Sequence, residues 1–162
     1  MCKPWSVDRI THLPGRPCSA AAALDVVGDR WALLVVRELM FGNHRFTDIV
    51  RNTGAPRDRL AARLKDLVES GVVEKRQYQD APPRSEYHLT RAGRDLAPVL
   101  QALLAWGDRW VVDQPPMRLR HHDHELHMHQ VCDVCGERVR RADVTREVRV
   151  EGWDEAGPVV AR

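Results

Sequence analysis

Two short apolar stripes separated by a glycine turn constrain the fold of this chain more than any other feature. In the first stripe the apolar residues have i, i+3, i+4 spacing: Phe46, Ile49 and Val50. In the second they face inward at i, i+4, i+7, i+8: Leu60, Leu64, Leu67 and Val68. Residues 54–56 (Gly-Ala-Pro) form the turn, and Ser70 and Gly71 end the second segment. Two helices joined by a short turn that contains glycine predict a helix-turn-helix.

A polar hairpin is predicted directly after the second helix. Residues 72–79 (VVEKRQYQ) and 85–90 (SEYHLT) are rich in β-branched and aromatic residues, which favour strands. The loop between them, Asp-Ala-Pro-Pro-Arg, ends at Arg84. A hairpin in this position is typical of a wing, so the predicted fold class is mainly α with a small β-hairpin wing.

Further helices are expected on both sides of this motif. Ser19 can cap a helix over residues 20–27, and residues 31–40 (WALLVVRELM) are apolar nearly all round, so that helix belongs in the core. Thr90 can cap a long last helix that is more apolar than one small domain would bury. A second copy of the chain could cover the excess, which predicts a homodimer.

Length and composition predict one domain with extensions. The chain has 162 residues, of which 43% are hydrophobic and 30% charged. We expect an N-terminal arm over residues 1–17, a winged helix-turn-helix domain over 18–113, and a C-terminal extension over 117–162, because Gln-Pro-Pro at 114–116 breaks the last helix. The apolar runs are too short to span a bilayer and no secretory signal is visible, so we expect a cytoplasmic protein without a membrane partner.

Four sequence blocks follow one another in the order of these elements: ALDVVGDRWALLVVRELMFGNHRFTDI, RLKDLVESGVVEKRQY, PPRSEYHLTRAG and WGDRW. In this order they resemble HxlR-type, MarR-like winged helix-turn-helix regulators. The resemblance implies a non-catalytic, sequence-specific regulator that binds double-stranded DNA as a homodimer. We expect it to act as a repressor released by a redox or small-molecule signal, although the chain itself does not distinguish a repressor from an activator. One departure concerns the second helix, where the family usually has a capping Ser before Pro and this chain has Ala55.

The candidates for DNA contact lie on the second helix and at the hairpin tip: Arg57, Asp58, Arg59, Ala62, Arg63, Lys65 and Arg84. On a helical wheel Arg59 points outward near the helix N-terminus, where a guanidinium can donate two bonds to guanine, and the small Ala62 allows close approach. The other cations of the helix suit phosphates, Asp58 complements the helix dipole, and Arg84 suits a minor groove. The alternative is a solvated helix face and an ordinary loop.

The signal is predicted to act at Cys18 or in a pocket. The resemblance implies that a cysteine just before the first helix can respond to oxidants or electrophiles, and Arg16 together with the helix N-terminus favours a thiolate there. Alternatively, Cys18 is only a small buried apolar group. A competing small-molecule site would lie between the dimer helices, with tryptophans as its lining: Trp31, Trp106 and Trp110.

The C-terminal extension contains a potential zinc site. Cys132 and Cys135 are spaced to bind one metal ion, and His121 and His124 form a second pair upstream, so these residues predict a structural zinc in a β-rich, zinc-ribbon-like extension. Other histidines crowd the same segment: His122, His127 and His129. Which histidines would bind is left open, and the alternative is a metal-free hairpin.

The extension has two alternative functions, a protein-interaction module and a zinc-dependent enzyme. A zinc-ribbon module that binds another protein would show no salt-sensitive affinity for DNA. A zinc-dependent deaminase would need a His two residues before its glutamate and a Pro before the first cysteine of the pair. Asp123 lies two residues before Glu125 and Val131 precedes Cys132, so the sequence argues against that enzyme.

Overall fold

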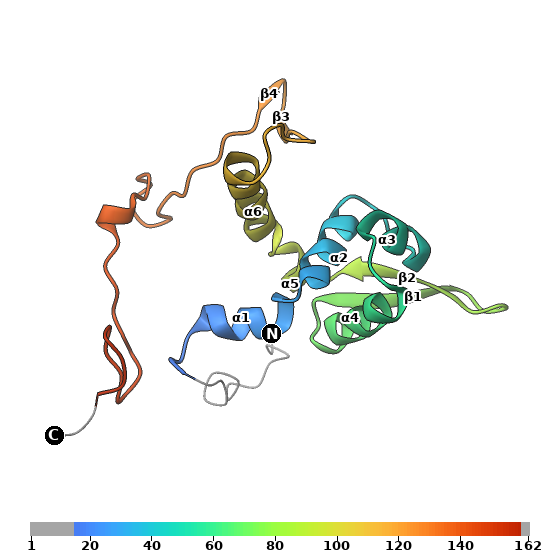
Figure 1. Cartoon of the computed structure of the whole chain (residues 1–162), viewed down its shortest axis with the longest axis horizontal. Helices are drawn as coiled ribbons and strands as arrows, with labels where there is room; N and C mark the ends of the chain where they lie inside the picture. The colour runs from blue at the N-terminus through green and yellow to red at the C-terminus, as the bar shows by residue number, and fades with distance from the viewer. Residues whose placement is uncertain (1–14, 160–162) are drawn as a thin grey trace. The chain divides into compact units, whose positions relative to one another are not determined.

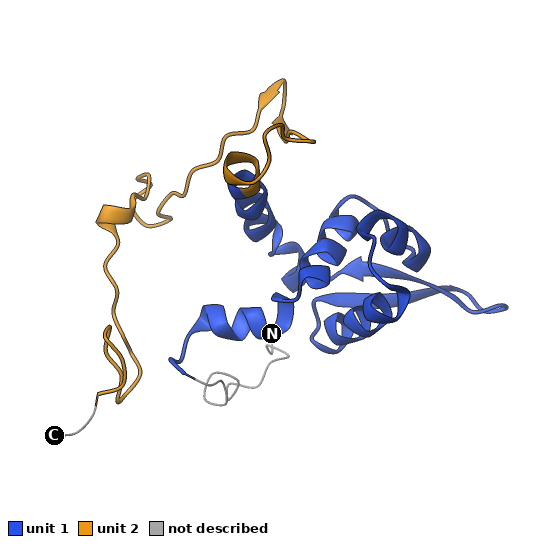
Figure 2. Cartoon of the chain, in the orientation of Figure 1, with its two compact units in different colours: residues 1–106 blue, residues 107–162 orange. Residues whose placement is uncertain are grey.

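The computed structural model describes residues 15–159, which form parts of two compact units, residues 1–106 and 107–162 (Figure 2). The division after Trp106 falls ahead of the linker predicted at 114–116. Most of the predicted N-terminal arm, including Cys2, lies outside the described residues. Within residues 15–159 no helix is both long and apolar enough to cross a membrane.

The first unit begins with two helices, α1 (Ser19–Val27) and α2 (Arg30–Met40) (Figure 1). The predicted cap of α1 is wrong by one residue, because Ser19 is already helical and Cys18 is the N-cap, without a side-chain cap hydrogen bond. At α2 the Asp29 carboxylate accepts a hydrogen bond from the Trp31 backbone N–H at 2.8 Å, which satisfies a donor that the helix itself leaves free. The predicted core helix is confirmed.

The helix-turn-helix consists of α3 (Phe46–Thr53) and α4 (Arg57–Glu69). Gly54 has φ 67°, a left-handed conformation that a residue with a side chain rarely adopts, and it ends α3. Pro56 is the N-cap of α4, so the helix begins at Arg57 even without the missing serine cap. Both predicted helices are confirmed.

The wing is an antiparallel hairpin of β1 (Val73–Gln79) and β2 (Arg84–Leu89), in which Val73 pairs with Leu89. The register shifts between Gln77 and Gln79 near the tip. The Tyr87 N–H donates to the His44 carbonyl at 2.9 Å, so the loop before α3 is attached to the wing.

The long helix expected after Thr90 is interrupted. Thr90 caps only the short α5 (Arg91–Arg94), where its hydroxyl accepts from the Gly93 N–H, and α6 (Ala97–Trp110) follows. Pro98 explains the break, because it has no N–H to donate to the carbonyl four residues earlier and is tolerated only in the first turn of a helix.

The core of the first unit is aliphatic and is shared by the helices and the base of the wing. Its fully buried larger side chains are Val35, Val36, Ile49, Leu60, Leu64, Leu67 and Val73. Glu38 is the one buried charged residue of the described chain. Its carboxylate accepts hydrogen bonds from Arg37 at 2.8 Å, Asn43 at 2.8 Å and Asn52 at 2.9 Å, which links α2 to the following loop and to α3.

The second unit contains little regular structure. It has a two-stranded ladder of β3 (Arg120–His121) and β4 (His124–Glu125), a 3-10 turn at Arg141–Asp143, and isolated bridges at Val131–Arg138 and Trp153–Pro158. No side chain from residue 107 to residue 159 is buried.

Candidate nucleic-acid interface

The helix α4 has one buried and one exposed side. Leu60, Leu64 and Leu67 are at most 1% exposed and face the core. The exposed residues include five of the predicted DNA contacts: Arg57, Asp58, Arg59, Ala62 and Lys65. This arrangement exposes three cations, interspersed with carboxylates, on a helix whose position is held by its leucines.

The exposed cations of α4 differ in how they are engaged. The Arg57 guanidinium lies over the Phe46 ring, 5.2 Å from its centroid, and Lys65 pairs with Glu69 at 3.7 Å. Arg59 makes no ion pair or side-chain hydrogen bond with any residue in the range 15–159. Of the three, Arg59 is therefore the most available to a partner molecule.

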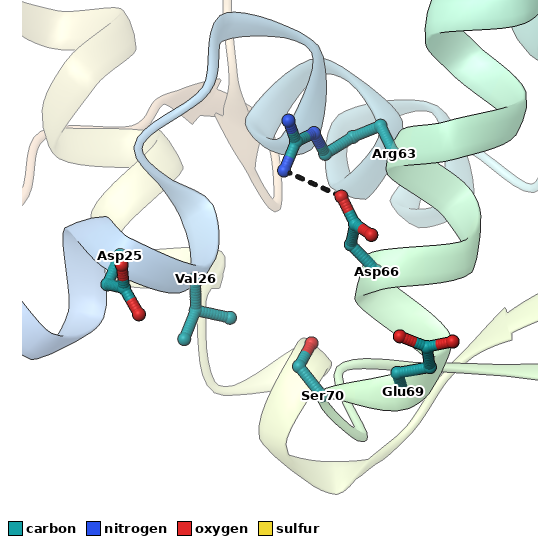
Figure 3. Close-up of a pocket in the computed structure, with 6 residues that line it drawn as sticks. All are labelled: Asp25, Val26, Arg63, Asp66, Glu69 and Ser70. Atoms are coloured by element: carbon teal, nitrogen blue, oxygen red, sulfur yellow. Dashed lines mark ion pairs between the residues drawn. The ribbon is translucent and has the colours of Figure 1, made fainter. Parts of the chain in front are cut away.

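Arg63 is held by neighbouring carboxylates. Its guanidinium lies 3.4 Å from Asp29 and 3.1 Å from Asp66, and Figure 3 shows it directed toward Asp66. The buried Nε atom lies within ion-pair distance of Asp29 but lacks the geometry of a hydrogen bond. The phosphate contact predicted for Arg63 stays a prediction, and we expect it to be weaker than that of Arg57 or Lys65.

A small polar cavity lies beside Arg63, between α1 and α4 (Figure 3). It is lined by Asp25, Val26, Arg63, Asp66, Glu69 and Ser70. None of the three tryptophans predicted to line an effector pocket borders it, so the position of an effector pocket stays a prediction.

The wing and the start of α3 add one predicted cation and two residues that the sequence analysis missed. Arg84 is exposed, with no ion-pair partner in the described part of the chain. Arg45, the N-cap residue of α3, pairs with Glu86 at 3.4 Å and lies 5.6 Å from the centroid of the exposed Tyr78 ring. A helical wheel of α4 alone could not find Arg45 and Tyr78, because they approach one another only through tertiary packing.

Two histidines join the helix-turn-helix to the wing. The His44 and His88 rings stack with centroids 4.2 Å apart and an interplanar angle of 24°. A His44 ring nitrogen also lies 3.0 Å from the Tyr87 carbonyl oxygen. Together with the backbone bond between Tyr87 and His44, these contacts restrict movement of the wing relative to α3.

Cys18 has the surroundings of a reactive thiol. It is exposed at the N-terminus of α1. The backbone N–H groups of Ala21 and Ala20, with the Arg16 charge, hold the pKa of its thiol below the ordinary value. The alternative of a buried apolar group is wrong, since the side chain is open to solvent.

The predicted metal ligands form two separate pairs. His121 and His124 are opposite one another in the β3–β4 ladder, with ring centroids 5.5 Å apart. The backbone N–H groups of Cys135 and Val134, together with the Cys135 side chain, hold the pKa of the Cys132 thiol below the ordinary value. Across residues 15–159, no group of three or more His, Cys, Asp or Glu side chains is gathered to hold a metal ion.

Comparison with known proteins places this interface in a family. Residues 26–115, more than half of the chain, match the model of the HxlR-like helix-turn-helix. A helix-turn-helix-type transcriptional regulator of Mycobacterium tuberculosis, itself uncharacterised, is 43% identical over 133 residues, which cover 80% of this chain and 84% of the relative. Another, YvaP of Bacillus subtilis, is 37% identical over 90 residues, 55% of this chain and 83% of the relative.

Solved structures agree with this assignment. The crystal structure of PA1607, a candidate transcription factor, has a TM-score of 0.74 at 32% identity and covers 90% of this chain and 100% of its own. The redox regulator HypR in its oxidised form has a TM-score of 0.53 at 30% identity and covers 57% of this chain and 96% of its own. The chain therefore belongs to the HxlR-like helix-turn-helix family and is a DNA-binding transcriptional regulator with a winged helix-turn-helix fold, not an enzyme.

Proposed function

We propose that the protein is a homodimeric repressor that binds an inverted-repeat DNA site and is released from it by modification of Cys18. The observation that carries the DNA-binding part is the guanidinium of Arg59, which has no partner among residues 15–159 and lies on the exposed side of α4, next to a buried leucine stripe. With α4 in the major groove, Arg59 reaches base edges while Arg57 and Lys65 contact phosphates. Arg84 extends the contact from the wing.

The homodimer is supported by an exposed apolar stripe on α6. Val99, Leu103, Trp106 and Trp110 are spaced four, three and four residues apart, which places them on one side of the helix. Each is about half or more exposed in the single chain. A second copy that packs its own α6 against this stripe would bury these side chains and would present two copies of α4 about one DNA turn apart.

The signal is proposed to be an electrophile or oxidant at Cys18. The lowered pKa of the exposed thiol gives it a larger thiolate fraction near neutral pH than an ordinary cysteine has, and HypR, a structural neighbour, is named a redox regulator. Addition of the Cys18 thiolate to a quinone forms a carbon–sulfur bond and converts the quinone ring to a hydroquinone. This reaction needs neither a second thiol nor another oxidant. Since its target is chromosomal DNA, the protein is proposed to work in the cytoplasm.

The test combines selection of DNA with measurement of mass in solution. Purified full-length protein is mixed with genomic DNA fragments, with and without benzoquinone, and the bound fragments are sequenced. We expect a two-fold symmetric site with half-sites about 10 bp apart, and its loss after quinone treatment of the wild type but not of Cys18→Ser. If the protein retained no DNA, the DNA-binding part of the proposal would be contradicted. If quinone still released Cys18→Ser from DNA, the sensor role of Cys18 would be contradicted.

Two matched variants on α6 test the dimer interface. Leu103→Glu lies in the apolar stripe, whereas Ala105→Glu lies on the same helix outside it, and both residues are exposed. Light scattering is expected to show a monomer for Leu103→Glu and a dimer for Ala105→Glu. A dimer that survives Leu103→Glu would show that α6 is not the interface.

A further inference from the structure

The side chains predicted to bind zinc lie on two hairpin turns of the second unit. In the first, the Leu126 N–H donates to the Leu119 carbonyl at 2.8 Å and the ladder of β3 and β4 closes the turn. In the second, the Val139 N–H donates to the Gln130 carbonyl at 2.9 Å, and the Cys132 N–H donates to the Glu137 carbonyl at 2.9 Å. Each turn is therefore held by its own backbone hydrogen bonds.

The first turn distinguishes among the histidines that the sequence leaves as alternatives. His121 and His124 are register partners, and their side chains lie at the base of the turn with the rings edge to face. His122 occupies the turn itself, with φ 53°. His127 and His129 follow the ladder and have no strand partner in the described chain. His121 and His124 are the two that face one another across the ladder, and the His122 ring also lies near that of His121, with centroids 4.1 Å apart.

The second turn contains both cysteines of the predicted metal site, Cys132 and Cys135. The Gly136 N–H donates to the Cys132 carbonyl at 2.7 Å, and Gly136 has φ 73°, which lets the chain turn back directly after Cys135. Cys132 and Cys135 lie three residues apart at this turn, with Cys132 partly buried and Cys135 exposed. Two thiols held at this spacing by a hydrogen-bonded turn are suited to bind one metal ion.

Neither hairpin is stabilised by a hydrophobic core. Val131 is 54% exposed and Val134 is 95% exposed, and no side chain between residues 107 and 159 is buried. Ordering a residue costs about 1–2 kcal/mol in backbone entropy, which apolar burial does not offset in this unit. A bound metal can supply this stabilisation, because binding to an otherwise loose site contributes directly to folding.

We propose that one zinc ion joins the two hairpins through His121, His124, Cys132 and Cys135. Two nitrogen and two sulfur ligands complete a closed tetrahedral shell of the structural type. The two pairs are separate in the structure. The seven residues between His124 and Cys132 span at most about 25 Å, and this length limits the distance between the two pairs. This inference does not depend on the proposed DNA-binding mechanism.

The test uses the full-length protein after removal of any affinity tag. Elemental analysis is expected to give about one zinc per chain, and cobalt substitution is expected to give the absorption of a tetrahedral site with thiolate charge transfer. Alanine at His121 or His124, and serine at Cys132 or Cys135, should each weaken zinc binding at least tenfold. The matched controls His127→Ala and His129→Ala should retain zinc. Zinc-free protein, or equal loss in the controls, would overturn the assignment.

A ligand exchange separates loss of a ligand from loss of folding. His124→Cys keeps a zinc-binding group at the same place, so it should restore the metal that His124→Ala loses and should strengthen the cobalt charge-transfer band. Failure of His124→Cys to bind zinc would overturn the role of His124. DNA binding by the wild-type protein is measured in the same series, with and without a chelator. A protein that contains no zinc but still binds DNA would refute the zinc site and would leave the proposed DNA-binding function intact.

Discussion

The leucines of α4 and the valines of the second unit are similar side chains in opposite surroundings. Leu60, Leu64 and Leu67 are at most 1% exposed, whereas Val131 and Val134 are at least half exposed. The leucines repeat with the period of a helix and lie on one side of it, so neighbouring helices can cover them together. The valines lie in short turns without such a period. Apolar residues build a core only where a regular element gathers them on one face.

The largest expected effect comes from opening the core of the first unit. Leu64→Ala removes a side chain that is 1% exposed and should lower the free energy of unfolding by about 2–5 kcal/mol through lost burial and the cavity left behind. Val134→Ala in the second unit should change it by no more than about 0.5 kcal/mol. Urea denaturation followed by circular dichroism measures both. Similar losses in the two variants would remove the contrast between the units.

The next effect concerns the buried carboxylate of Glu38. Glu38→Gln removes the charge that strengthens the hydrogen bonds from Arg37, Asn43 and Asn52, and we expect a loss of about 1–3 kcal/mol in the free energy of unfolding. The exposed pair of Glu147 with Arg149 in the second unit is the comparison, and Glu147→Gln should cost less than about 1 kcal/mol. The same denaturation measurement applies. Unchanged stability of Glu38→Gln would show that the charge adds nothing to this network.

Substitutions that weaken DNA binding should lie in the first unit. Arg59→Ala is expected to weaken binding to the selected site by about 1–3 kcal/mol and to relax one base position. Lys65→Ala should weaken all sequences alike and reduce the salt dependence. Arg146→Ala, an exposed arginine of the second unit, is the matched control and should bind as the wild type does. Fluorescence anisotropy at several salt concentrations is the measurement, and equal losses on specific and random DNA for Arg59→Ala would contradict its role.

The smallest expected effect on stability belongs to Cys18. Cys18→Ser should change the free energy of unfolding by no more than about 0.5 kcal/mol, because the side chain is exposed. The thiol itself should be distinctive, since its lowered pKa keeps a larger fraction as thiolate near neutral pH. Alkylation of Cys18 should therefore persist to lower pH in the folded protein than in urea, and decline only as the pH falls through the lowered pKa. Mass spectrometry of the labelled peptide checks this, and identical pH profiles would refute it.

Predictions from local patterns succeeded where the pattern itself determines the structure. The leucine stripe of α4, the glycine at residue 54 and the β-rich segments around the wing depend on residues within one or two turns of each other, and all three elements are present. The prediction of one long last helix was wrong. Thr90 is a good cap, but Pro98 permits only a helix that starts anew, so the single long helix is two.

The candidate site residues likewise divide into those that a local pattern predicts and those that depend on packing between elements. The outward direction of Arg59 and Lys65 follows from the helical period. The engagement of Arg63 by Asp29 does not, because Asp29 precedes α2 and meets α4 only when the helices pack. Arg45 and Tyr78 were missed for the same reason. Zinc binding stays a prediction, although the β3–β4 ladder now indicates His121 and His124 among the histidines.

The sequence by itself determined the order of elements, the buried side of α4 and the family, because helical spacing, turn residues and ordered motifs are local properties of the chain. Only the tertiary structure decided which charged groups are free and which are paired. It enclosed Glu38 among three donors, directed Arg63 toward Asp29 and Asp66, and stacked His44 on His88. These partners are joined by packing between elements, and the strength of an ionic or polar contact depends on distances and burial that no local pattern contains.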